Sequence, residues 1–391
     1  MNEHSDQQSN VHISGQFFAR LNETIAELQL AGRDIIRLDI GSPDMPPPEA
    51  VICTLARSAA VPSHHGYQAH NATGKLRAAW ADFYNQNYSV ELDPDREVLP
   101  LIGSKEGIFH ILQAALEPGD TVIIPDPGYL TYLQGAKFAK AKPFTLQLRP
   151  ENDYLPDFAE IPAEVARQAK MMWLNYPNNP TGATATRTNL EQAVDFAREH
   201  DLLLCHDAAY SQVTYEGYKA PSVLQVPRSI DVAIEFNSLS KSYNMAGWRS
   251  GVAVGQQEAL RALYALKTNT DSGHFRPILD AAVQALKTDP AWIRERNAVY
   301  QKRRDLVVKA FTAIGVEIPK PKGAIYIWFP VPSKMSAETF VGSLLEHYQV
   351  SLTPGTVFGT GGEGYVRLSY TIQEEPLSEA MQRITEFYGS I

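Results

Sequence analysis

Short apolar runs, each closed by small or polar residues and followed by a helical pattern, recur through the middle of the chain from Val98 onward. This alternation of strand, turn and helix is typical of a parallel sheet covered by helices. Within it, Thr188 and Glu191 predict a capping box for one helix. The chain has 391 residues, 44% of them hydrophobic, which allows one large core and a smaller one. We therefore predict an α/β fold with a mainly parallel sheet between helices.

The two ends of the chain differ from this middle region. Residues 17–30 carry apolar side chains at helical spacing, and a short strand then runs into the Pro-rich segment GSPDMPPP. Near the other end, Asp289-Pro290 predicts the start of a long charged helix, and an α+β pattern follows it. We expect residues 1–45 to form an N-terminal arm and part of the small domain, 46–288 the large domain, and 289–391 the small C-terminal domain.

Composition excludes several classes of function. The formal net charge is -9 without a visible Lys/Arg cluster, so we expect no nucleic-acid partner. No segment approaches the roughly 20 apolar residues of a membrane span, and the N-terminus has no export pattern. The two cysteines, Cys53 and Cys205, lie far apart, which suits a reducing compartment. We expect a cytoplasmic protein with no membrane partner and no metal site.

The segment NSLSKSYNMAGWRSG, residues 237–251, is the first candidate for chemistry. Lys241 follows the apolar run DVAIEF, so it lies just past the end of a predicted buried strand. Partial desolvation lowers the pKa of such a lysine and frees the neutral amine that reacts with an aldehyde. Arg249, close behind, suggests an anion. Together they fit pyridoxal phosphate (PLP), although a polar loop with a solvated lysine and a surface arginine has the same pattern.

Other predicted strand ends carry residues that suit the same ligand, because open α/β sheets bind ligands at that edge. Residues 103–107, GSKEG, open a helix, whose free N–H groups favour a phosphate. Asp207 is costly to bury without a cation, and a protonated pyridine nitrogen is one. Tyr210 follows within reach of the same ring. Tyr129 either stacks on a ring or belongs to the core, and the turn around Asn179 needs no ligand to explain it.

In their order and spacing these motifs resemble the class I/II, fold-type I PLP-dependent aminotransferases along essentially the whole chain. The motifs are GSPD (41–44), Tyr67 before GKLR, GSKEG (103–107), PGYLTY (127–132), NYPNNPTG (175–182), HDAAY (206–210), SLSKSYNMAGWRSG (238–251) and YVRLSYT (365–371). Within the family, the residues of these motifs are most similar to those of the LL-diaminopimelate aminotransferase group. The resemblance implies a homodimer that moves an amino group from an L-amino acid to a 2-oxo acid by a ping-pong mechanism.

The resemblance also assigns roles at the cofactor. Lys241 would bond PLP covalently and then carry the proton between the substrate's Cα and the cofactor. Asp207 would pair with the pyridinium nitrogen and keep it protonated. Tyr210 and Asn179 would hydrogen-bond the phenolic oxygen of the ring, and Tyr129 would stack on the ring.

Two further groups of residues are implied at the phosphate and at the substrate. The residues that would hold the phosphate are Ser104, Lys105, Ser238 and Arg249, joined by Tyr67 of the neighbouring subunit. Arg367 would grip the α-carboxylate as a bidentate fork, with Asn179 and the backbone near Gly41 closing over it.

The chain departs from the diaminopimelate group at one loop. In that group the loop after the intersubunit tyrosine carries a glutamate that binds the substrate's distal ammonium, whereas residues 67–73, YQAHNAT, include no acid. Burying an ammonium without its partner costs about 2 to 5 kcal/mol. We therefore expect diaminopimelate to be a poor donor and aspartate or glutamate to be preferred. His274 or Arg276 could favour the acidic side chain, unless both point to solvent or to a subunit contact.

Two other functions are compatible with this scaffold. A β-eliminating lyase would use the same cofactor site, because the scaffold does not fix the fate of the carbanion. A non-catalytic PLP-binding regulator would carry an appended basic DNA-binding module, for which the acidic, short N-terminal segment leaves no room.

Overall fold

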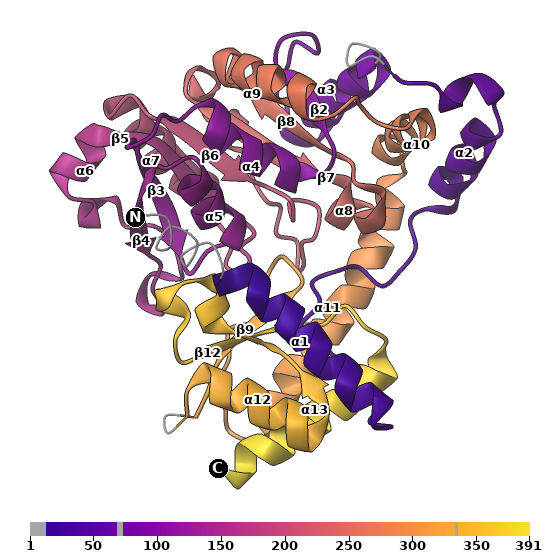
Figure 1. Ribbon diagram of the computed structural model, residues 1–391, viewed down its shortest axis with the longest axis vertical. Helices are drawn as coiled ribbons and strands as arrows, with labels where there is room; N and C mark the ends of the chain where they lie inside the picture. Colours follow the sequence, from indigo (N-terminus) through magenta and orange to yellow (C-terminus); the bar gives the residue numbers. More distant parts are fainter. Residues whose placement is uncertain (1–12, 69–72, 333–334) are drawn as a thin grey trace, which may run out of the picture.

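The computed structural model describes residues 13–68, 73–332 and 335–391. A larger α/β part contains the main sheet, and a smaller α+β part lies below it in Figure 1. No helix among the described residues is long and apolar enough to cross a membrane.

The main sheet has seven strands, six of which run in the same direction. From edge to edge it consists of β2 (Val98–Leu101), β8 (Gly251–Gly255), β7 (Ala233–Ser238), β6 (Leu203–Asp207), β5 (Ala169–Asn175), β3 (Thr121–Asp126) and β4 (Lys142–Gln147). Strand β8 runs antiparallel to both of its neighbours, and the strands from β7 to β4 are parallel. The predicted α/β fold with a mainly parallel sheet is confirmed.

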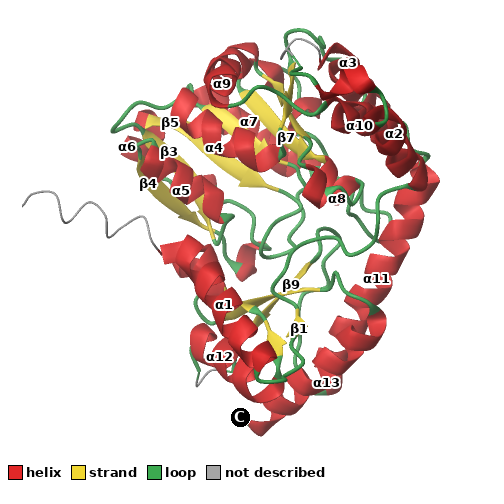
Figure 2. Cartoon of the chain, turned by 45° about the vertical axis from the view of Figure 1, so that its right-hand side comes forward, coloured by secondary structure: helices red, strands yellow, loops and turns green. Residues whose placement is uncertain are grey.

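Helices pack on both faces of this sheet (Figure 2). Strand β5 illustrates the reason, because its side chains alternate between two apolar clusters. Met171 and Trp173 belong to one cluster, and Met172 and Leu174 belong to the other. The helices of this part are α2 (Glu49–Ala59), α3 (Gly74–Tyr88), α4 (Ser104–Ala114), α5 (Leu130–Phe138), α6 (Ala163–Gln168), α7 (Arg187–Glu199), α8 (Leu239–Ser242), α9 (Gln257–Thr270) and α10 (Arg276–Leu286).

The prediction for the start of α7 was wrong by two residues. Its N-cap is Thr186, and the capping box is formed with Asn189 rather than by Thr188 and Glu191. The Thr186 side chain accepts from the Asn189 backbone N–H, and Asn189 Oδ1 accepts from the Thr186 N–H at 2.8 Å. An asparagine side chain can therefore complete the box that Glu or Gln more often completes.

The smaller part joins the two ends of the chain. Strand β1 (Ile36–Arg37) pairs in parallel with β10 (Val350–Ser351), and a three-stranded antiparallel sheet follows the order β11-β12-β9. The remaining strands are β9 (Tyr326–Pro330), β11 (Thr353–Pro354) and β12 (Tyr365–Ser369), and the helices are α1 (Ile13–Leu30), α12 (Ala337–Tyr348) and α13 (Glu374–Ser390).

The long helix α11 (Pro290–Ala313) runs along both parts (Figure 2). The Asp289 side chain caps it by accepting from the Ala291 N–H at 2.8 Å, as the sequence predicts. The segment after β1 is also fixed to the small sheet, because the Ser369 N–H donates to the Leu38 carbonyl at 2.8 Å. This contact brings residues 39–41 to the boundary where the parallel strands of the main sheet end.

Candidate active site

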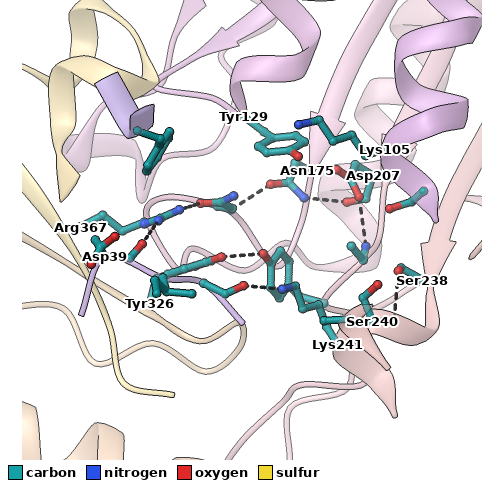
Figure 3. Close-up of a pocket in the computed structure, with 18 of the residues that line it drawn as sticks. Asp39, Lys105, Tyr129, Asn175, Asp207, Ser238, Ser240, Lys241, Tyr326 and Arg367 are labelled. Carbon is teal, nitrogen blue, oxygen red and sulfur yellow. Dashed lines mark hydrogen bonds between the residues drawn. The ribbon is translucent and has the colours of Figure 1, made fainter. Parts of the chain in front are cut away.

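A cavity of about 490 Å³ lies between the two parts. On one side it is lined by residues at the carboxyl ends of the parallel strands, and on the other by residues of α1, β9, β12 and the segment after β1. Figure 3 shows Arg367 and Asp39 at one end and Lys105 and Asp207 at the other. The predicted site residues found in the lining are Gly41, Ser104, Lys105, Tyr129, Asn179, Asp207, Tyr210, Ser238, Lys241, Arg249 and Arg367.

Lys241 lies in α8, a single helical turn directly after β7. The Ser238 side chain caps this turn by accepting from the Ser240 N–H at 3.1 Å, which fixes the point where the strand becomes a helix. The lysine Nζ donates to the Gly41 carbonyl oxygen across the boundary. Burial lowers the pKa of Lys241 to about 8, helped by the positive charges of Arg367 and Arg249. The amine is thus easier to deprotonate than an ordinary lysine.

Asp207 ends strand β6 and is buried, with 5% of its surface exposed. Its Oδ2 accepts from the Tyr132 hydroxyl at 2.8 Å and its Oδ1 from the Ala209 N–H at 3.2 Å. Desolvation raises the pKa of Asp207, although these two hydrogen bonds and His206 oppose the rise. Because the hydrogen bonds come from neutral donors, a cationic ligand group in the cavity would stabilise the carboxylate.

Asn175, at the end of β5, orders the floor of the cavity. Its Nδ2 donates to the Asp207 carbonyl at 2.8 Å, and its Oδ1 accepts from the Asn179 N–H at 2.8 Å. Sequence analysis missed both Asn175 and Tyr132, although each lies within a motif quoted there. The signal was available for Asn175, a polar residue at the end of an apolar strand.

The turn between β2 and α4 has the features of an anion site. Gly103 has φ +77, and a Cβ atom at this position would overlap the guanidinium of Arg249. The guanidinium therefore lies over this turn. It is held there by a hydrogen bond from Arg249 Nη1 to the Ala246 carbonyl at 2.8 Å. Ser104 is the first residue of α4, where free backbone N–H groups favour negative charge. Lys105 beside it is exposed and lines the cavity.

Arg367, on β12, is fixed at the opposite end. Its Nη1 donates to Asn179 Oδ1 at 2.9 Å and its Nη2 to the Asp39 carbonyl at 2.8 Å. The guanidinium carbon lies 4.4 Å from the ring centre of Tyr326 and 4.7 Å from that of Phe358. Its Nε is buried and has no hydrogen-bond partner within the part of the chain that the structure describes. The guanidinium is thus held rigidly and retains an unused donor.

Tyr210 contributes a hydroxyl to the cavity. This hydroxyl lies 2.8 Å from the hydroxyl of Tyr326, which comes from β9 of the smaller part. A Cβ atom at Gly41 would overlap the Tyr326 ring, so only glycine lets the backbone pass at that point. Tyr326 is a cavity residue that sequence analysis missed, because its strand reads as ordinary core.

Further unpredicted residues of the small part form one wall of the cavity. Phe18 and Asn22 come from α1, and Arg37 follows on β1. Arg37 donates from Nε and Nη2 to the two carboxylate oxygens of Asp39, both at 2.7 Å, and from Nη2 to Asn22 Oδ1 at 2.9 Å. Side chains two residues apart in an extended segment point the same way, which was the available signal for Arg37 on β1 and Asp39 just after it.

Three residues named from the sequence do not line this cavity. Tyr67 is 93% exposed, and residues 69–72 of its loop lie outside the described residues. His274 is buried and donates from Nε2 to the Arg249 carbonyl at 2.9 Å. Arg276 donates from Nε to Asp280 Oδ1 at 2.8 Å. Neither His274 nor Arg276 therefore contacts a substrate in this chain's own cavity.

Known proteins are similar to this chain in both sequence and fold. The family model for aminotransferase class I and II matches residues 33–384. The LL-diaminopimelate aminotransferase of Moorella thermoacetica is 46% identical over 96% of this chain and 96% of its own length. LL-diaminopimelate aminotransferase 2 of Trichormus variabilis is 45% identical over 96% of each chain.

Solved structures agree with these relatives. A probable N-succinyldiaminopimelate aminotransferase from Thermus thermophilus superposes with a TM-score of 0.90 at 39% identity, covering 94% of this chain and 99% of its own. Apo-BacF from Bacillus subtilis gives a TM-score of 0.93 at 36% identity, with 96% of both chains covered. The chain belongs to the class I and II aminotransferases, and transamination is therefore supported over β-elimination and over a regulatory role.

Proposed function

We propose that the cavity binds PLP and that the protein uses it to transfer an amino group between an L-amino acid and a 2-oxo acid. The observation that carries this proposal is the meeting of Lys241, Asp207 and Arg367 in one cavity. A lysine with a lowered pKa, a buried carboxylate without a cationic hydrogen-bond donor and a rigid guanidinium are the three groups that this chemistry requires.

The residues fit the cofactor at both of its charged ends. Asp207 would pair with the ring N–H, since the hydroxyl and the backbone N–H that donate to it are neutral. Ser104, Lys105, Ser238 and Arg249 would hold the phosphate at the start of α4. Bound there, PLP supplies an aldehyde for the lysine amine and a ring that takes up the electrons left on the substrate's Cα.

The protein's own steps follow from these positions. Arg367 binds the substrate's α-carboxylate and so orients the Cα–H bond. Lys241, with its amine free and neutral, would act as the base that takes the proton from the substrate's Cα and holds it for return. Asp207 would pair, as a carboxylate, with the protonated ring nitrogen. Tyr210 and Asn179 would hydrogen-bond the ring oxygen, and Tyr129 would stack on the ring.

We further propose a cytoplasmic homodimer in which Tyr67 reaches the phosphate of the neighbouring subunit. The support is its 93% exposure in the single chain, which is unusual for a large aromatic side chain. We also propose the domain division at residues 45/46 and 288/289. Loss of PLP affinity in Tyr67→Ala, with the molecular mass in solution still that of a dimer, would support this role.

For the amino donor, we propose aspartate or glutamate ahead of LL-diaminopimelate. The described part of the cavity lining has two carboxylates, Asp39 and Asp207, against five cations, Arg37, Lys105, Lys241, Arg249 and Arg367. Asp39 is paired with Arg37, and Asp207 is assigned to the ring nitrogen. No carboxylate of this lining is then left for a distal ammonium, and burying one without a partner is costly.

LL-diaminopimelate is the second candidate, because it gives its name to relatives that are 45–46% identical over nearly the whole chain. The test is kcat/KM for aspartate, glutamate and LL-diaminopimelate, measured with the same enzyme preparation. Aspartate and LL-diaminopimelate would be paired with 2-oxoglutarate, and glutamate with oxaloacetate. A wide preference for LL-diaminopimelate would contradict the proposed donor while leaving the aminotransferase intact.

A further inference from the structure

The loop that joins α9 to α10 (Figure 1) carries a buried histidine, His274. His274 is 8% exposed, and its Nε2 lies 2.9 Å from the carbonyl oxygen of Arg249. Because a carbonyl oxygen only accepts hydrogen bonds, Nε2 carries the proton and donates. Desolvation lowers the pKa of His274, so the neutral ring with a single N–H donor prevails at neutral pH.

Arg249 has a backbone that needs such support. Its φ is 56, in the left-handed region that a residue with a long side chain adopts only at a cost in free energy. From this backbone the side chain extends over Gly103 at the start of α4. The contact from His274 to the Arg249 carbonyl therefore fixes the backbone from which the guanidinium reaches the turn.

The loop that carries His274 is itself anchored to that turn. Asp271 accepts from Lys267 Nζ at 2.6 Å and from the Gly273 N–H at 2.7 Å. Lys267 Nζ also lies 3.3 Å from both carboxylate oxygens of Glu106, which accepts from the Ile102 N–H at 2.7 Å. The turn before α4 and the loop after α9 are thus joined through one buried lysine. The loop that contacts the Arg249 backbone is therefore held in a fixed position relative to the turn that Arg249 covers.

We propose that His274 is a positioning residue that holds Arg249 in place for the cofactor's phosphate, without contacting cofactor or substrate itself. This inference rests on the proposed function, because it takes Arg249 as a phosphate ligand. It gives His274 a role on the phosphate side of the cavity in place of a contact with an acidic substrate side chain.

The experiment compares PLP with pyridoxal, which has the same ring and aldehyde but no phosphate. Equilibrium binding of each is measured on the full-length apoprotein of wild type, His274→Phe and His274→Gln. His274→Phe should weaken PLP binding about 10- to 100-fold, since it removes a donor and leaves a buried carbonyl unpaired. Its affinity for pyridoxal should stay within about threefold of wild type. His274→Gln places an amide N–H near the position of Nε2 and should restore most of the PLP affinity.

Several outcomes would overturn the inference. PLP affinity in His274→Phe equal to wild type would do so, and so would an equal loss for PLP and pyridoxal, which indicates general damage to the fold. If His274→Phe does not fold, His274→Asn replaces it, because its shorter amide does not reach the Arg249 carbonyl and should give the same selective loss. In an Arg249→Ala background, His274→Phe should cause no further loss of PLP affinity, whereas an additive loss contradicts the mechanism. A wild-type protein that does not bind PLP would instead overturn the proposed function.

Discussion

The cavity and the interior of the large part both contain buried charged side chains, but these side chains have different sets of hydrogen-bond partners in the two regions. In the interior, Glu235 is fully buried and accepts hydrogen bonds from Tyr84, Ser222, the Val223 N–H and His206. On the neighbouring strand, Asp207 accepts, among the described residues, from one hydroxyl and one backbone N–H. A carboxylate with a full set of partners stabilises the fold, whereas one left short of partners is available to a ligand.

Two lysines that are largely shielded from solvent repeat this difference. Lys267 is 3% exposed and pairs with the carboxylates of Glu106 and Asp271. Lys241 donates to a backbone carbonyl, and its charged neighbours, Arg367 and Arg249, are both cations. The first lysine has a carboxylate partner on each of two segments. The second is destabilised in its charged form, which favours the neutral amine that covalent chemistry needs.

The largest effect should come from exchanging the two lysines for apolar residues. Lys241→Ala should lower turnover at least about 10⁴-fold and abolish the visible absorbance of the lysine-bound cofactor. Lys267→Met should keep that absorbance at saturating PLP but lower the free energy of unfolding by about 3 kcal/mol, because two partly buried carboxylates lose their partner. Absorbance spectra and denaturant titrations of both variants separate these results. Near wild-type turnover in Lys241→Ala would remove the lysine from the mechanism.

Substitutions of Asp207 and Glu235 should also separate a loss of activity from a loss of stability, with a smaller effect than for the lysines. Asp207→Asn should raise the barrier to turnover by about 3 kcal/mol, a loss of more than about 100-fold, since the ring nitrogen loses its charge partner. Its apoprotein should unfold at nearly the same denaturant concentration as wild type. Glu235→Gln should do the reverse, with kcat within about threefold of wild type and a stability loss of about 2 kcal/mol. Full activity in Asp207→Asn would make Asp207 a purely structural carboxylate.

A substitution of Arg367 tests whether this end of the cavity binds the α-carboxylate, the group that all amino-acid donors share. Arg367→Lys should raise KM about 10- to 100-fold for every donor and acceptor, because an ammonium cannot form the planar two-bond contact. Initial rates with aspartate, glutamate and alanine suffice to show it. An increase confined to one donor would mean that Arg367 contacts the side chain and that the α-carboxylate binds elsewhere.

The smallest effect is in the pH dependence of cofactor attachment. Since the pKa of Lys241 is lowered from 10.5 to about 8, its neutral fraction rises as pH increases through 8 and is nearly complete above 9. The rate at which apoprotein bonds PLP should therefore increase about tenfold between pH 7 and pH 9 and then level off. A rate that keeps climbing to pH 10 is what a solvated lysine gives, and it would contradict the burial argument.

The strand ends of the main sheet could be predicted from sequence because parallel strands deliver their last residues to one edge. Ser104, Asp207 and Lys241 all follow apolar runs, and the chain order of those runs is enough to bring them together. Strand β4 was not predicted, because it is an edge strand with only one buried residue, Leu146, and so lacks a buried apolar pattern.

Contacts between segments far apart in the chain could not be predicted from the sequence, because they depend on how those segments pack. Tyr326 meets Tyr210 only after the small part has docked on the large one, and Arg37 meets Asn22 only after α1 has packed within the small part. Hydrophobic periodicity identifies Tyr326 as buried but not which hydroxyl it faces. His274 is the clearest case, since its contact with the Arg249 carbonyl depends on the packing of two loops and has no signature in the spacing of residues.

The most direct measurement is to identify the lysine that carries the cofactor. The PLP-loaded protein would be reduced with borohydride, which makes the lysine–cofactor bond permanent, then digested and analysed by mass spectrometry. The account predicts the pyridoxyl group on Lys241 at about one per chain, with none on Lys105 or Lys267. Modification of either of those lysines instead, or no specific modification, would contradict the assignment of the active site.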